Sequence, residues 1–154
     1  MKVAVSSCLL GINCKYSGGN NYHDELNRWL KDHEITAVCP EVLGGLPVPR
    51  ASCEIRNEKV KTKSGDDKTK EYRRGAEKAL AQVRENGCEL VILQARSPSC
   101  GVCHIYDGTF SKKLIEGSGI FARMLREQGI PALDTENIES IGFVLNGKEN
   151  SVKR

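Results

Sequence analysis

The sequence predicts an α/β fold, namely a single Rossmann-like domain in which a mainly parallel sheet is flanked by helices. Short apolar runs typical of strands alternate along the chain with amphipathic segments typical of helices, and this alternation favours a parallel sheet. The chain has 154 residues, the length of one ordinary domain, with 39% hydrophobic and 28% charged residues. We therefore expect one domain over residues 1–146 and a polar C-terminal tail over residues 147–154.

Four apolar runs predict the strands of the sheet. They lie at residues 3–6, 35–38, 90–93 and 130–133. The third, with the sequence Leu-Val-Ile-Leu, is the clearest of them. A further stretch, residues 54–62, has Asn57-Glu58 at its centre and predicts a small β-hairpin outside the main sheet.

Apolar residues at three- and four-residue spacing predict four helices. The predicted segments are 24–33, about 67–86, a helix that begins near Gly119 and ends before Gly129, and 138–145. In the second segment Ala76, Leu80 and Val83 share one face, and Gly87 supplies a stop signal. Helices between successive strands are what a parallel sheet requires.

Composition and charge exclude several classes of protein. No apolar run approaches the about 18 residues that a membrane span needs, and the first residues contain no leader-type cleavage site. The net charge of +3 is modest, and basic residues are interleaved with acidic ones, so no basic surface indicates nucleic-acid binding. We expect a cytoplasmic protein that binds a small molecule, and the sequence does not indicate an oligomeric state.

Seven cysteines are many for such a chain, and an odd number cannot all form internal disulfides. In a reducing compartment, clustered cysteines favour metal binding or catalysis. Cys8, Cys39 and Cys100 each follow one of the first three predicted strands. A single cysteine at a strand end is most often a small buried hydrophobe. Three of them at the carboxyl edge of a parallel sheet, where ligands bind in such folds, predict a common site.

Three converging thiolates leave more than one kind of site open. A closed zinc site normally has four protein ligands, which Cys103 would complete together with Cys8, Cys39 and Cys100. An iron–sulfur cluster held by three thiolates would instead leave one iron open to substrate. The pair Cys100 and Cys103 is also spaced as in a thiol–disulfide enzyme. Spacing does not separate these hypotheses.

Five motifs occur in order over about residues 3–137, and together they resemble the thiouracil desulfurase family. They are CLLGINCKYSGG, CPEVLGGLPVPR, SPSCG, IYDGTFS and GSGIFARMLREQGI. The resemblance implies an α/β fold that carries a [4Fe-4S] cluster on three cysteines, which the motifs map onto Cys8, Cys39 and Cys100. It also implies that the iron without a protein ligand takes the sulfur of a thiolated pyrimidine. Hydrolysis then gives the oxo base and sulfide without net electron transfer.

Such a reaction needs a base that activates water beside the metal. Glu41 is our first candidate, because it comes two residues after a proposed cluster ligand. Ser97 and Ser99 are candidates for binding substrate or orienting the water. Each has a structural alternative. For Glu41 it is a carboxylate that caps a helix or pairs with Arg50, and for the serines it is a turn, which serines next to proline often form.

The remaining candidates concern substrate binding and the other cysteines. Arg50 and Tyr106 are candidate substrate contacts, since an aromatic ring stacks on a pyrimidine, whereas we expect Asp107-Gly108 to form a turn. For Cys14 the sequence predicts either a structural role or a role in supporting the cluster ligands. It predicts a core position for Cys88 and an inert position for Cys53. Cys53 and Cys103 both depart from the family pattern. Three roles stay open for Cys103: a substitute ligand, a redox partner of Cys100, or a ligand of the open iron. The histidines, His23, His33 and His104, are not at metal-ligand spacing.

Overall fold

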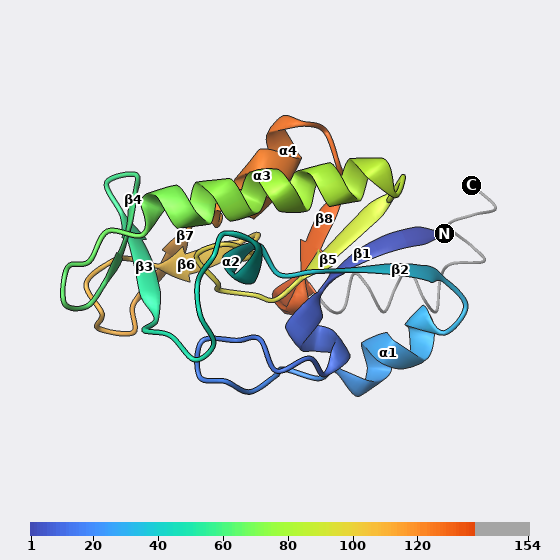
Figure 1. Ribbon diagram of the computed structural model, residues 1–154, viewed down its shortest axis with the longest axis horizontal. Coiled ribbons are helices and arrows are strands. Elements are labelled where there is room, and N and C mark those ends of the chain that lie inside the picture. The colour runs from blue at the N-terminus through green and yellow to red at the C-terminus, as the bar shows by residue number, and fades with distance from the viewer. Residues whose placement is uncertain (138–154) are drawn as a thin grey trace.

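A four-stranded parallel sheet forms the centre of the computed structural model, which describes residues 1–137 (Figure 1). The strands are β1 (Lys2–Ser6), β2 (Glu34–Val38), β5 (Leu90–Leu93) and β8 (Ala132–Asp134), in the spatial order β2-β1-β5-β8. Neighbouring strands all pair in parallel. The predicted α/β class and all four strands are confirmed, with the last strand beginning just after Pro131.

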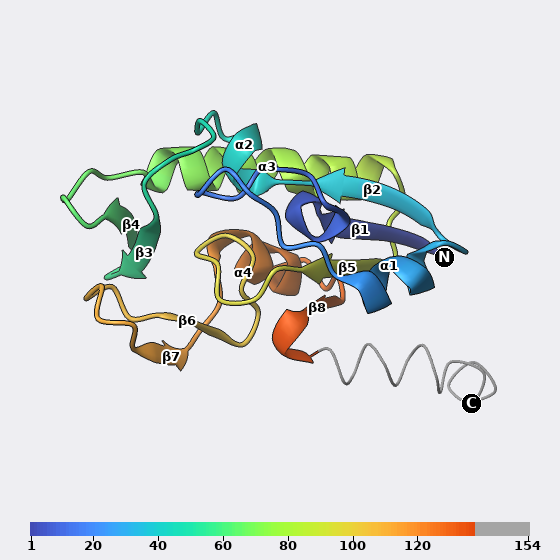
Figure 2. The same ribbon diagram turned by 90° about the horizontal axis from the view of Figure 1, so that it is seen from below.

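Helices cover both faces of this sheet. They are α1 (Asp24–Leu30), α2 (Pro40–Leu43), α3 (Thr69–Glu85) and α4 (Ile120–Glu127), with 3-10 turns at Ser7–Leu10 and Thr135–Asn137. Figures 1 and 2 show α3 and α4 side by side on one face and α1 on the other. Three of these helices match predicted segments, whereas the four-residue α2 is too short for periodicity to reveal.

Alternation along the strands divides the core into two layers. Ala4, Val91 and Leu93 point to the face of α3 and α4, and their neighbours Val3, Val5 and Ile92 point to the face of α1. These strand residues are completely shielded from solvent. Burial on both faces explains why β1 and β5 are short aliphatic runs without polar alternation.

Two antiparallel hairpins lie together at one end of the molecule, beyond the carboxyl ends of the sheet strands (Figures 1 and 2). The first pairs β3 (Cys53–Arg56) with β4 (Lys59–Thr62), and the second pairs β6 (His104–Tyr106) with β7 (Leu114–Glu116). The first hairpin confirms the prediction for residues 54–62. The second was not predicted, because strands of three residues carry almost no alternation signal.

Part of the sequence prediction lies outside the described residues, namely the helix at 138–145, the domain boundary at 146 and the tail at 147–154. Within the described residues, no helix combines the length and the apolar character that crossing a membrane requires.

Glycines allow α2 to pack directly on α3. A Cβ atom at Gly75, inside α3, would overlap the carbonyl oxygen of Pro40, and one at Gly44 would overlap that of Glu71. Backbone therefore lies on backbone where these helices meet. Because α2 begins immediately after Cys39, this contact also fixes the end of β2.

We predict that Gly75→Ala destabilises the protein. In an ordinary helix interior this change is stabilising by about 1 kcal/mol. Here the new methyl group has no space, and overpacking against rigid backbone costs about 3 kcal/mol. Urea unfolding measures the difference, with the exposed Lys78→Ala in the same helix as the control. An unchanged or increased free energy of unfolding for Gly75→Ala would contradict the packing described here.

Candidate active site

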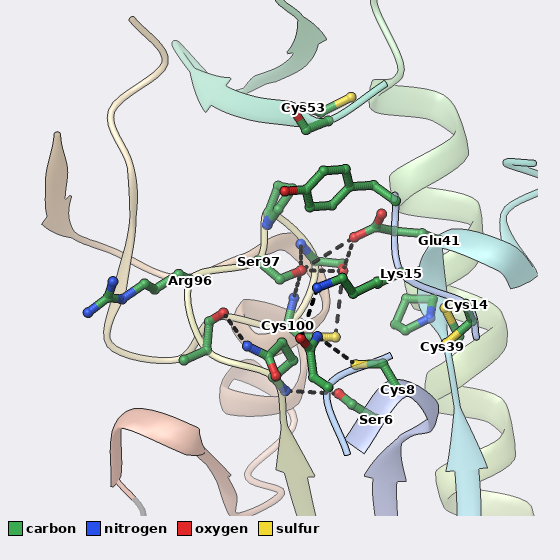
Figure 3. A pocket seen from close by; sticks show the side chains of 18 of the residues that line it. Ser6, Cys8, Cys14, Lys15, Cys39, Glu41, Cys53, Arg96, Ser97 and Cys100 are labelled. Carbon is green, nitrogen blue, oxygen red and sulfur yellow. Dashed lines mark hydrogen bonds between the residues drawn. The ribbon is translucent and has the colours of Figure 1, made fainter. Parts of the chain in front are cut away.

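A cavity of about 490 Å³ opens at the carboxyl edge of the sheet (Figure 3). Its walls include the residues that follow β1, β2 and β5, together with residues of the two hairpins. The strand order changes direction at β1, since β2 lies on one side of it and β5 on the other. This is the place where open α/β sheets bind ligands.

The structure brings the three predicted cysteines to this cavity. Cys8 lies in the 3-10 turn after β1, Cys39 is the N-cap of α2, and Cys100 lies in the loop after β5. Figure 3 shows their side chains around the same space. Cys103 is half-buried and is not among the residues that line the cavity. Proximity in sequence to Cys100 therefore does not make it part of this wall.

Cys14 lies beside two of these thiols, as the second of its two expected roles, support of the ligands, requires. Its thiol hydrogen-bonds with both Cys8 and Cys39. The hydrogen bond from Cys14 lowers the pKa of Cys8, and together with the backbone of Val42 it lowers the pKa of Cys39 to about 7. The same two contacts, with burial, raise the pKa of Cys14 itself. A hydrogen bond from Cys14 thus favours the thiolate form of the cysteine that accepts it.

Polar side chains also contact the other sulfur atoms. The Asn21 amide donates to Cys8 Sγ at 3.5 Å, and the Ser99 hydroxyl oxygen lies 3.5 Å from Cys100 Sγ. Complete burial nevertheless raises the pKa of Cys100. A buried thiol of this kind becomes a thiolate when a cation compensates its charge.

Glu41 stands at the centre of the polar wall. Its Oε2 accepts hydrogen bonds from Ser99 Oγ at 2.7 Å and from Ser97 Oγ at 3.3 Å, and the two serine oxygens lie 2.8 Å apart. Ser97 Oγ also accepts the backbone N–H groups of Ser99 and Cys100, both at 3.1 Å. The serines thus form a turn and contact Glu41 at the same time, so the two interpretations of them are compatible.

Arg50 is committed to protein partners. Its Nε donates to Glu41 Oε1 at 2.9 Å, Nη1 donates to the Pro47 carbonyl at 3.0 Å, and Nη2 donates to the Cys14 carbonyl at 2.9 Å. Nη2 also lies 2.9 Å from Glu41 Oε1, and the Arg50 and Glu41 side chains are only 6% and 12% exposed. The expected ion pair is therefore present, and it ties the Cys14 loop to α2.

The loop that carries Cys100 is anchored from behind. The buried carboxylate of Asp134, at the end of β8, accepts the backbone N–H of Val102 at 2.7 Å and that of Cys103 at 3.4 Å. Gly101 and Gly119 pack against neighbouring backbone with no space for a Cβ atom. Sequence reasoning missed Asp134, because a single acidic residue after a short strand carries no recognisable spacing.

The outer wall of the cavity comes from the hairpins and α3. Tyr106 lines it, as do Tyr72, Cys53 and Phe110, which sequence reasoning did not connect with ligand binding. Tyr72 is buried and hydrogen-bonds with Cys53 and Glu41, and burial raises its pKa. The expected turn at Asp107 is confirmed by its acceptance of the Thr109 N–H at 2.9 Å.

The zinc hypothesis requires four ligands around one ion. Within residues 1–137, no three Cys, His, Asp or Glu side chains lie close enough together to hold a single metal ion. Thiolates that bind separate irons of a cluster are not subject to this requirement. Cys103, the fourth ligand that a closed zinc site would need, is not among the residues that line the cavity with Cys8, Cys39 and Cys100.

The histidines lie away from the cavity wall. His23 caps α1 by accepting the Leu26 N–H, and His33 packs on Trp29 with 4.0 Å between ring centroids. His104 lies 3.2 Å from Glu136.

Comparison with known proteins agrees with the motifs. A family model described as 2-thiouracil desulfurase matches residues 3–137. The chain is 38% identical over 149 residues to the uncharacterized protein YbbK of Bacillus subtilis (strain 168). The matched region covers 90% of this chain and 99% of YbbK. Among solved structures it is similar to the [4Fe-4S]-dependent thiouracil desulfidase TudS, with a TM-score of 0.86 and 37% identity over 94% of this chain and 97% of TudS. The predicted resemblance is confirmed.

We predict that Arg50→Ala strongly destabilises the fold. Removing one member of a buried ion pair leaves the other charge uncompensated and costs about 3–5 kcal/mol. The matched control is Arg96→Ala, because Arg96 is 49% exposed in its pair with Glu136 and such pairs contribute less than about 1 kcal/mol. Urea unfolding compares the two variants. Equal losses would show that the Arg50–Glu41 pair is no more important than a surface contact.

Proposed function

This chain belongs to the 2-thiouracil desulfurase family, and we propose that it hydrolytically removes sulfur from a thiolated pyrimidine at a [4Fe-4S] cluster. The products are the oxo base and sulfide, without net redox. One observation carries the proposal: Cys8, Cys39 and Cys100 line the same cavity as Glu41, Ser97 and Ser99. Sulfur ligands for a metal cluster and a group that can activate water thus face a common space.

The donor set fits such a cluster. The three cysteines come from three separate loops, and each already lies beside a polar group or thiol that stabilises negative charge on sulfur. Hydrogen bonds to ligand sulfur atoms are a known means of tuning iron–sulfur clusters. We assign Cys8, Cys39 and Cys100 as the ligands. When bound, the cluster would supply an iron without a protein ligand, which acts as a Lewis acid toward the thiocarbonyl sulfur.

The protein's own groups account for the water chemistry. We propose that Glu41 takes a proton from water as the water oxygen attacks the ring carbon that carries sulfur. The carbon–sulfur bond then breaks, and sulfur leaves with both electrons of that bond, so that thiopyrimidine and water give oxo base and hydrogen sulfide. Ser97 and Ser99 donate to the same Glu41 oxygen and hold the carboxylate toward the cavity.

Arg50 and Tyr106 take different roles in this proposal. Arg50 holds Glu41 through Nε and Nη2 and has its remaining contacts with backbone carbonyls, so we assign it to positioning the base. Tyr106 is half-buried at the cavity wall and is accessible to the pyrimidine. The substrate class is a thiolated pyrimidine such as thiouracil or thiouridine.

The relatives support the chemistry and the compartment. TudS, a [4Fe-4S]-dependent thiouracil desulfidase, shares 37% identity over nearly the whole chain. Seven free cysteines also fit the reducing conditions of the cytosol, where we expect the protein to act.

Cluster content tests the assignment of ligands. We predict that anaerobic reconstitution gives about four irons and four acid-labile sulfides per chain, as a [4Fe-4S] cluster requires. Cys8→Ala, Cys39→Ala and Cys100→Ala each lose the cluster, whereas the matched control Cys103→Ala keeps it. Iron and sulfide analysis measures both. Equal dependence on Cys103, or retention of the cluster without Cys39, would refute the assignment.

Turnover tests the role of Glu41. We predict that Glu41→Gln lowers kcat for sulfide release from 2-thiouracil at least about 100-fold, the usual contribution of a general base. Glutamine keeps only one accepting oxygen and leaves the buried Arg50 without its charge partner, so the free energy of unfolding should also fall by about 3–5 kcal/mol. Turnover is therefore compared per cluster, on folded protein whose iron content matches that of the native chain. Glu25→Gln, on the exposed side of α1, is the control. Native turnover by Glu41→Gln would remove Glu41 from the mechanism.

A further inference from the structure

The loop between β6 and β7, residues 107–113, has an unusual backbone. Gly108, Phe110 and Lys112 have φ angles of 93°, 57° and 64°. Residues with side chains rarely adopt such angles, and in native proteins they occur where the surrounding structure enforces them, often at ligand sites. Phe110 and Lys112 both line the cavity. The strained conformation therefore occurs in a segment that borders the candidate active site.

The carboxylate of Glu54, on β3, enforces this conformation. Its Oε1 accepts the backbone N–H of Gly108 at 3.0 Å and that of Phe110 at 3.0 Å. Asp107 closes the loop, since its N–H donates to the Lys113 carbonyl at 2.9 Å. A Cβ atom at residue 108 would overlap Arg56, so the loop also packs tightly against the first hairpin.

Phe110 has no place in the hydrophobic interior. Among the described residues, none of the three core clusters includes it. Phe121, by contrast, is fully buried in the core between the sheet and α3. Phe110 is instead half-buried at the cavity wall. An aromatic side chain that is held in a strained conformation beside a cavity, without contributing to the core, is suited to contact a ligand.

We propose that Phe110 is a specificity-determining residue on which the pyrimidine ring stacks, and that Glu54 is the positioning residue that holds it there. The ring class follows from the proposed function, on which this inference rests. Aromatic side chains stack on nucleobase rings because both present a flat π-face, and the contact does not depend on hydrogen bonds. The loop would thus select a planar heterocycle over other sulfur compounds.

Uracil binding tests the stacking directly and needs no turnover. With the full chain after anaerobic reconstitution, equilibrium dialysis gives the dissociation constant for uracil. We expect Phe110→Leu to raise it about tenfold, the effect of losing one base–aromatic stack. Phe110→Tyr, which keeps the ring, should remain within about twofold of the native value. Tyr22→Leu removes an exposed aromatic ring outside the cavity wall and is the matched control.

Glu54 is tested by comparing two substitutions. Glu54→Gln keeps an oxygen that accepts both N–H groups and should bind uracil as the native chain does, whereas Glu54→Ala should match Phe110→Leu. Glu58→Ala, at the turn of the same hairpin with a side chain 72% exposed, is the control. In sulfide release from 2-thiouracil, the affected variants should show a raised KM and a kcat within about twofold of native.

The outcomes separate this inference from the proposed function. Unchanged uracil binding in Phe110→Leu, or no uracil binding by the native chain, would overturn the stacking role. Equal losses in Glu54→Gln and Glu54→Ala would overturn the positioning role. Native uracil binding that weakens in Phe110→Leu, without any sulfide release from 2-thiouracil, would support the inference and contradict the desulfurase activity.

Discussion

The buried ion pair between Glu41 and Arg50 connects the segments from which the candidate active site is built. Arg50 donates to Glu41 and also to the carbonyl of Cys14, and Glu41 in turn accepts from Ser97 and Ser99. One pair of charges thus links the loop after β1, the helix after β2 and the loop after β5. A desolvated pair is stable only with good geometry and further hydrogen bonds, so this pair depends on all three segments being correctly placed.

The sheet makes that placement possible. Parallel pairing brings the carboxyl ends of β2, β1 and β5 to one edge, and the aliphatic residues of β1 and β5 are shielded on both faces by helices. A rigid frame below the cavity allows the loops above it to carry polar and strained residues. The outer wall likewise combines a regular frame with a strained loop. Glu54, on strand β3, holds Phe110 in a backbone conformation that core residues avoid.

Sequence reasoning identified what depends on local pattern. Aliphatic runs predicted all four strands, and the position of Cys8, Cys39 and Cys100 after three of them predicted their convergence. It missed features that depend on contacts between distant segments. The β6–β7 hairpin has strands too short to alternate, and the link from Glu54 to Phe110 joins residues 56 positions apart. The chemistry itself came from motif resemblance, because thiol spacing alone left zinc and disulfide chemistry open.

The central claim is hydrolysis without net redox at a cluster-bearing cavity. The most direct measurement is anaerobic turnover of 2-thiouracil in water enriched in the heavy oxygen isotope, with no reductant added. The account predicts one uracil and one sulfide for each 2-thiouracil consumed, with one heavy oxygen atom in the uracil. Sulfide release that requires a reductant, or uracil without the isotope, would contradict it.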